Sequence, residues 1–183
     1  GAVTALSQSL KINKKNTDAR NLLGLVYFEL GEVVEALSQW IISRSFQSQK
    51  NLADYYIEEI QNNPARLQTI NTTIKKYNQS LLYCEQGSYD LAVIQLKKVL
   101  SMNMNLLKAH ELLALLYMKN ENYGRARSEL KRVLAIDRTN TCALRYMQEL
   151  DEASGKNDQK EEEKSNKDVI AYTSGNETII QPV

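Results

Sequence analysis

The feature of this sequence that most constrains its fold is an internal repeat of constant length. Residues 73–106 align without a gap on residues 107–140, and a third copy covers residues 17–50. Residues 1–16 supply only the second half of a fourth copy, so we expect the parent protein to begin further upstream. A repeat of this length buries its apolar face only by stacking on its neighbours. The sequence therefore predicts an array of similar units.

Each copy has the pattern of a helix, a turn and a second helix. The first helix is apolar at positions three to four residues apart. Gly31 and Gly87 mark the turn in two copies, because glycine suits the left-handed residue that ends a helix, and Glu121-Asn122 takes this place in the third copy. Only 7 glycines and 2 prolines occur among the 183 residues, which also favours long helices.

Four positions in each copy carry a shared pattern of a small residue, an aromatic or bulky residue, an alanine and a second bulky residue. They are Gly24, Tyr27, Ala36 and Trp40 in the first copy, Ser80, Tyr83, Ala92 and Leu96 in the second, and Ala114, Tyr117, Ala126 and Leu130 in the third. This pattern, over about residues 1–153, resembles the tetratricopeptide repeat (TPR) family. The resemblance implies an all-α fold, in which antiparallel helix pairs form a right-handed superhelix.

The repeat register slips once, at an insertion of residues 51–72. Its first part has the pattern of an amphipathic helix, which Asn62-Asn63-Pro64 breaks. Proline suits the first position of a following helix, and that helix can run as far as Glu85. We expect one inserted helix and one elongated helix, which bend the array locally.

The C-terminal part changes character in three steps. Residues 141–153 predict a closing helix, so the helical array spans residues 1–155. Residues 156–168 are a polar, mixed-charge run that predicts a flexible linker. Residues 169–183 favour β-structure, and we expect this short tail to be docked, disordered or the start of a further segment. More weakly, the tail is similar to those of bacterial TPR proteins in which such a segment precedes a transmembrane helix.

The resemblance also implies a concave groove lined by the first helices of the units. Apolar and aromatic side chains with a few polar ones suit a peptide or helix that carries hydrophobic anchors. The groove candidates are Asn21, Leu25 and Phe28 from the first copy, Tyr77, Asn78, Leu81 and Cys84 from the second, Lys108, Glu111, Leu115 and Met118 from the third, and Arg145 and Glu149 from the closing helix. The alternative is that several of them are only packed between neighbouring helices.

One binding mode of the family is expected to be absent. Some members hold a C-terminal carboxylate with paired Lys and Asn side chains at fixed groove positions. Here those positions carry Tyr77, Leu81, Glu111 and Leu115. We therefore expect a groove for a peptide or helix rather than a clamp for a chain terminus.

Catalysis, metals and cofactors are not expected. His110 occupies a repeat position normally filled by a packing residue, and no phosphate-binding loop is present. Cys84 and Cys142 are widely separated in the sequence and cannot complete a zinc site with one histidine. A net charge of +1 predicts no nucleic-acid partner.

The predicted function is thus a protein–protein interaction module whose partner is another protein or peptide. The alternative is a structural unit that self-assembles through the insertion and the tail, with Trp40, Tyr55 and Tyr56 exposed in a symmetric contact. Lys97-Lys98 and Lys131-Arg132 occupy equivalent positions of two copies, either as a solvated face or as a contact for acidic partners or an anionic membrane. No apolar run reaches the length of a bilayer span. We expect a cytoplasmic protein, or one held at the cytoplasmic face of a membrane through a segment outside this chain.

Overall fold

A computed structural model describes residues 1–152 of the chain. The chain divides into two compact units, Gly1–Leu144 and Arg145–Val183. The predicted linker at 156–168 and the predicted tail at 169–183 lie outside the described residues. Within residues 1–152 every regular element is a helix, and the predicted all-α array of helix pairs is confirmed.

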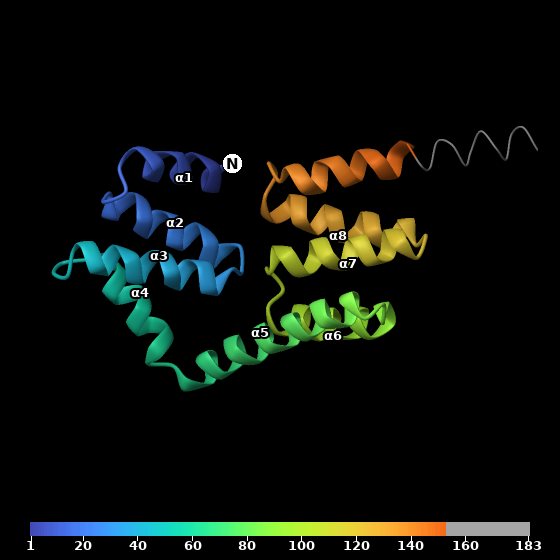
Figure 1. The fold of residues 1–183 in the computed structure, drawn as a ribbon, viewed down its shortest axis with the longest axis horizontal. Coiled ribbons are helices and arrows are strands. Elements are labelled where there is room, and N and C mark those ends of the chain that lie inside the picture. The colour runs from blue at the N-terminus through green and yellow to red at the C-terminus, as the bar shows by residue number, and fades with distance from the viewer. Residues whose placement is uncertain (153–183) are drawn as a thin grey trace, which may run out of the picture. The chain divides into compact units, whose positions relative to one another are not determined.

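The helices are α1 (Ala2–Ile12), α2 (Thr17–Glu29), α3 (Val33–Phe46), α4 (Leu52–Gln61), α5 (Pro64–Glu85), α6 (Tyr89–Met102), α7 (Leu107–Lys119) and α8 (Tyr123–Ile136). Consecutive helices pack as neighbours, and α2 with α3, α5 with α6, and α7 with α8 form hairpins (Figure 1). Residues 141–152 are helical as well and cross the boundary between the two units. Among the described residues, no helix combines the length and the apolar content that crossing a bilayer requires.

Close packing within each hairpin comes from a small residue on the first helix and a bulky residue on the second. In the first hairpin, a Cβ atom on Gly24 would lie 2.3 Å from Nε1 of Trp40, so only glycine leaves room for the indole. Trp40 is buried and its Nε1 donates a hydrogen bond to the backbone oxygen of Asn21 at 3.2 Å. The equivalent pairs, also buried, are Ser80 with Leu96 and Ala114 with Leu130.

Each of the three hairpin turns contains one residue in the left-handed conformation. Gly31 and Gly87 have φ angles of +76° and +73°, as the sequence predicts. In the third turn the left-handed residue is Glu121, with φ of +56°, although this conformation costs a residue with a side chain about 1–2 kcal/mol. Asn122 instead caps α8, because its side-chain oxygen accepts a hydrogen bond from the Arg125 backbone N–H at 3.4 Å.

Helix α4 lies where a regular array would place the first helix of another copy. Ala53 follows Ala19, and Ile57 follows Leu23, at the same spacing that separates the other copies, and all four residues are buried. Beside them, Tyr56 stacks on the indole of α3 with ring centroids 5.0 Å apart. The segment 51–72 therefore keeps the repeat spacing through α4 and loses it only afterwards.

Helix α5 is where the spacing is lost. Asn63 caps this 22-residue helix, with its side chain accepting from the Arg66 N–H at 3.0 Å, and Pro64 is its first residue. Ile70 in its first half packs against the apolar cluster around α3 and α4, while Ser80 in its second half belongs to the hairpin with α6. The first half of α5 thus takes the place of the second helix of the repeat unit that α4 begins. Its second half is the first helix of the next unit.

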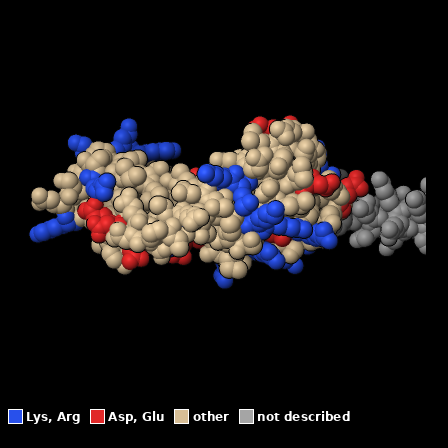
Figure 2. Space-filling view, turned by 90° about the horizontal axis from the view of Figure 1, so that it is seen from below, with Lys and Arg blue, Asp and Glu red and all other residues tan. Residues whose placement is uncertain are grey.

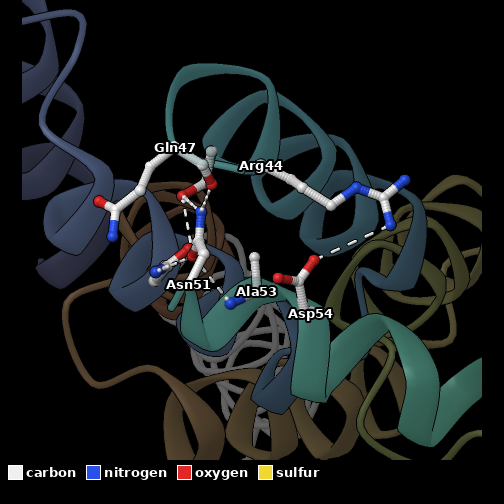
Figure 3. A network of polar contacts seen from close by, with 7 residues as sticks. Arg44, Gln47, Asn51, Ala53 and Asp54 are labelled. Atoms are coloured by element: carbon white, nitrogen blue, oxygen red, sulfur yellow. Dashed lines mark hydrogen bonds and ion pairs between the residues drawn. The ribbon is translucent and has the colours of Figure 1, made fainter. Parts of the chain in front are cut away.

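The side chain of Asn51 ties α4 to the first hairpin (Figure 3). Its oxygen accepts hydrogen bonds from the backbone N–H of Ala53 at 3.0 Å and from Nδ2 of Asn21 at 2.9 Å. Its Nδ2 donates to the backbone oxygen of Gln47 at 2.9 Å and to Oγ of Ser43 at 3.1 Å. One buried amide therefore caps α4 and fixes its start against α2 and α3.

Candidate functional site

A cavity of about 520 Å³ lies beside α5 in the first unit. One wall is a stripe along α5 from Arg66 to Asn78, and the turn between α2 and α3 forms a second wall. The segment between α6 and α7 forms the third wall, from Met102 to Lys108. This volume falls in the range of protein pockets that bind ligands, and it can hold several side chains.

The lining of the cavity is mainly apolar. Phe28 and Val33 contribute from the first hairpin, Ile70 and Ile74 from α5, and Leu106 from the segment before α7. Ile70 and Ile74 lie one turn apart on the same face of α5 and are only partly buried. The cavity therefore offers apolar surface that a guest side chain could cover.

Hydrogen bonds to backbone oxygens of the first hairpin join it to the segment before α7, although these parts lie about 75 residues apart in sequence. Nδ2 of Asn103 donates to the backbone oxygen of Gly31 at 3.1 Å, and the N–H of Leu107 donates to the backbone oxygen of Leu30 at 3.4 Å. A Cβ atom on Gly31 would lie 2.8 Å from the backbone of Leu106. Glycine at this turn is thus required by its conformation and by the close approach of the other segment.

An ion cluster reinforces the same junction. Nζ of Lys108 lies 2.7 Å from Oε2 of Glu32 and 2.5 Å from Oε1 of Glu35. Burial would lower the pKa of Lys108, but its hydrogen bonds to both carboxylates raise that pKa above its ordinary value. Burial raises the pKa of Glu32, and the hydrogen bond from Lys108 offsets this effect only in part. Burial is also the largest single effect at Glu35, but the hydrogen bond and charge of Lys108 together with a backbone hydrogen bond outweigh it, so the pKa of Glu35 is lowered.

Replacing Lys108→Met is expected to lower the free energy of unfolding by about 1–2 kcal/mol at pH 7, discounted because the lysine is half exposed. The lowered pKa of Glu35 means that its contribution is present above the ordinary carboxyl pKa and is lost as the pH falls through the folded value. Protonation of the two carboxyls in acid removes the ion pairs, and Glu35 is protonated only below the ordinary carboxyl pKa, so the difference from the wild type should shrink as the pH is lowered from 7 to about 3. Urea denaturation at about pH 7 and about pH 3 measures this, with Lys75→Met as the control for loss of an exposed lysine; an equal deficit at both pH values would contradict it.

Arg66 is the remaining charged residue of the lining. Its guanidinium carbon lies 5.0 Å from the centroid of the Phe28 ring, which is a cation–π arrangement. No carboxylate among residues 1–152 forms an ion pair with it. The cavity thus has one paired cluster of three charges and one unpaired cation.

The structure brings four of the predicted groove residues to the cavity: Phe28, Tyr77, Asn78 and Lys108. Tyr77 lines the cavity together with Glu32 and Lys108, and burial and the nearby charge of Glu32 raise the pKa of its hydroxyl. These residues come from three different helices.

The other predicted groove residues do not line the cavity. Asn21 is buried and bonded to Asn51, Leu25 packs against the cluster around Trp40, and Glu111 accepts a hydrogen bond from Nδ2 of Asn140 at 2.7 Å. Leu81 is exposed, while three further candidates are partly buried: Cys84, Leu115 and Met118. Arg145 and Glu149 belong to the second unit, where they pair with each other at 3.6 Å.

Sequence reasoning missed Glu32, Glu35 and Arg66. The equivalents of Glu35 in the other copies are Leu91 and Arg125, so two carboxylates at the start of α3 were visible as a departure from the repeat. Nothing in the sequence, however, places them beside Lys108. Arg66 lies in the segment that has no counterpart in the matched copies.

The expected exposure of Trp40 and of the basic residues on the second helices can be compared with the structure. Trp40 is 1% exposed, so the expectation that it takes part in an exposed contact is wrong; it fills the space beside Gly24. Lys97, Lys98 and Lys131 are exposed, and Arg132 lies 3.8 Å from Glu129. Figure 2 shows Lys and Arg side chains at the left end and right of the centre of the face that it presents, with a broad area without charged residues between them.

The described residues hold no group of three His, Cys, Asp or Glu side chains that could bind a metal ion. Cys84 and Cys142 are not joined in a disulfide. Burial, with a smaller effect of Glu85, raises the pKa of Cys84 and so lowers its reactivity.

Stacked helix hairpins beside an apolar cavity define a helical repeat scaffold, whose units contact mainly their neighbours and expose an extended surface. The family model described as "Tetratricopeptide repeat" matches residues 1–41 and 77–141, which is more than half of the chain. The chain belongs to the tetratricopeptide repeat family. It is therefore a protein–protein interaction module, and scaffolds of this kind are typically non-catalytic.

Solved structures with a similar fold include MamA, at 22% identity and a TM-score of 0.36 over 75% of this chain and 88% of that chain. The TPR domain of P58(IPK) is similar at 14% identity and a TM-score of 0.49, over 92% of this chain and 55% of that chain. No curated protein gives a significant match to the chain.

Proposed function

We propose that this chain binds an apolar segment of another polypeptide in the cavity beside α5. The observation that carries the proposal is the partly buried stripe of Ile70, Ile74 and Tyr77, which faces a space of about 520 Å³. Apolar side chains of a guest that enter such a space gain about 25 cal/mol for each Å² removed from water. The predicted groove candidates Phe28 and Asn78 lie on the same lining.

A selection from a random peptide library on the full chain tests this function. Ile74→Arg places a charge in the middle of the α5 wall and is expected to weaken binding of the selected peptides at least about tenfold. Ile94→Arg makes the same change on α6, where Ile94 is exposed and outside the cavity, and is expected to leave the affinities unchanged. Peptides that bind Ile74→Arg as tightly as the wild type would rule out the cavity.

Two further variants test the rest of the predicted groove. Leu81 and Leu115 lie on first helices but outside the cavity lining. If the guest is confined to the cavity, Leu81→Arg and Leu115→Arg retain the wild-type affinities. If either abolishes binding while Ile74→Arg does not, the guest lies along the first helices instead.

Self-assembly is the second candidate function, and exposed apolar side chains on α4 favour it. Leu52 is 62% exposed and Tyr55 is 60% exposed, and both lie on the helix that begins the segment between the matched copies. Light scattering at increasing concentration tests it on the wild type, on Tyr55→Glu and on a chain without residues 156–183. A dimer that Tyr55→Glu or the truncation dissociates would support assembly, and a monomer throughout would oppose it.

A further inference from the structure

We propose that Arg66 selects guest segments in which an Asp or Glu side chain lies beside the apolar anchors. This inference rests on the proposed function and adds to it the chemistry of the ligand. The partner is thus a polypeptide whose docking segment is both apolar and acidic.

The first argument is the pairing of charges around the cavity. Of its four charged lining residues, Lys108 is already paired with Glu32 and Glu35. Arg66 has no carboxylate partner among the described residues. A guest that brings a carboxylate to Arg66 supplies the missing partner, whereas an apolar guest would desolvate the guanidinium without compensation.

The second argument is the way in which the guanidinium is held. It stacks on the ring of Phe28 at 5.0 Å, and its backbone is fixed by the Asn63 cap at the start of α5. Stacking on a ring restrains the guanidinium but leaves its edge donors available for a carboxylate, which they can bind in a bidentate manner. Arginine so restrained loses less conformational entropy on binding than a mobile lysine does.

The third argument is that the two ends of the cavity differ in charge. Arg66 and Tyr77 lie in the first and second halves of α5, about 16 Å apart along the helix axis. Tyr77 lies near Glu32 and Lys108, so the ion cluster, which has one more carboxylate than cations, is at the Tyr77 end. An acidic guest residue is therefore favoured at the Arg66 end and disfavoured at the other, which fixes the orientation of the guest.

Other arginines on aromatic rings do not share this combination. Arg20 stacks on Phe46 at 5.5 Å but donates hydrogen bonds to Gln39 and to the backbone of Lys14. Arg125 lies 5.9 Å from the Tyr117 ring and outside the cavity. Among the described residues, Arg66 is the only arginine that has no carboxylate partner, stacks on an aromatic ring and lies beside the apolar lining of the cavity.

The test uses the full chain and individual peptides from the library selection whose binding Ile74→Arg abolishes. Each Asp or Glu of such a peptide is replaced by Asn or Gln, and dissociation constants are measured with the wild type, with Arg66→Gln and with Lys75→Gln. Lys75→Gln removes one positive charge from the same helix outside the cavity. Every peptide is also made with an amidated C-terminus.

We expect one acid-to-amide change to weaken binding to the wild type and to Lys75→Gln by about tenfold or more. Against Arg66→Gln the acidic peptide and its amide analogue should bind equally, and amidation of the C-terminus should change nothing. Selected peptides without acidic residues, an acidic preference that survives in Arg66→Gln, or a preference for the free C-terminus would each overturn the inference while leaving the cavity as the binding site. If no peptide depends on Ile74, the proposed function fails and the inference fails with it.

Discussion

Trp40→Ala is expected to lower the free energy of unfolding by about 3–5 kcal/mol. The indole is 1% exposed and lies at the centre of the cluster formed by α2, α3 and α4. It stacks on Tyr56 at 5.0 Å, contacts Phe28 at 5.9 Å, and donates its only hydrogen bond to the backbone of Asn21. Its removal leaves a cavity between three helices and takes away the hydrogen bond that the indole donates to the Asn21 carbonyl. Urea denaturation followed by circular dichroism measures the change without depending on indole fluorescence.

Two controls separate the loss of indole packing from a general weakening of α3. Ile41 neighbours Trp40 in sequence but is exposed, so Ile41→Ala should cost less than about 1 kcal/mol. Gly24→Ala should destabilise the wild type by about 1–3 kcal/mol, because its Cβ would meet the indole. In the Trp40→Leu background, which copies the bulky residue of the other hairpins, Gly24→Ala should cost much less. Additive effects of the two changes would contradict direct packing between them.

The repeated part of the fold was predictable from the sequence because each hairpin solves the same packing problem with the same few residues. A small residue faces a bulky one, and a left-handed turn residue follows, so similarity at a constant spacing is enough to place the helices. The same pattern places Trp40 among the bulky residues of the second helices, and only the self-assembly alternative expected Trp40 to be exposed. Its repeat position is occupied by leucine elsewhere, and only the absence of a side chain at Gly24 shows that an indole can be buried there.

The segment between the copies was harder to predict because it contains residues that follow the repeat spacing of the first hairpin and residues that follow that of the second. Ala53 and Ile57 keep the spacing of the first hairpin, while residues from Thr73 onward keep that of the second. Because the repeat spacing changes between these two parts, the sequence alone indicates an insertion, although α4 packs as a repeat helix does. Helix α5 has to satisfy both, and its length follows from the absence of a turn signal between Pro64 and Glu85.

The candidate site was predicted only in part, for a physical reason. Periodicity assigns residues to the face of a helix, and it correctly indicated that Phe28, Tyr77, Asn78 and Lys108 belong to first helices of the array. It does not report contacts between parts of the chain that are distant in sequence. The pairing of Lys108 with two carboxylates depends on such a contact, in which the turn of the first hairpin meets the segment before α7.

The second large effect is expected at a buried pair, His110 and Glu129, which joins α7 to α8. Nδ1 of His110 lies 2.6 Å from Oε2 of Glu129, and Nε2 lies 2.9 Å from the backbone oxygen of Met104. A carbonyl oxygen can only accept, so Nε2 carries a proton and donates it. The first copy has Arg20 and Gln39 at these positions, joined at 3.0 Å, so the pair is one form of a recurrent link between the two helices of a hairpin.

Glu129→Leu is expected to lower the free energy of unfolding by about 3 kcal/mol, because it leaves Nδ1 of a buried imidazole without a partner. His110→Leu should cost about as much, because the carboxylate of Glu129 then keeps only Arg132, at 3.8 Å. Glu129→Gln should cost clearly less, because the amide N–H can donate to a neutral Nδ1 while Nε2 keeps its bond to Met104.

The double variant His110→Leu with Glu129→Leu removes both partners together and should be more stable than either single leucine variant, because neither a buried imidazole nor a buried carboxylate is then left without its partner. The Met104 carbonyl loses its donor equally in His110→Leu and in the double variant. Urea denaturation of the four variants at pH 7 gives the coupling free energy between the two residues. Costs of the single variants that simply add in the double variant would show that the two side chains contribute independently. The pair would then stabilise the hairpin by packing rather than by its hydrogen bond.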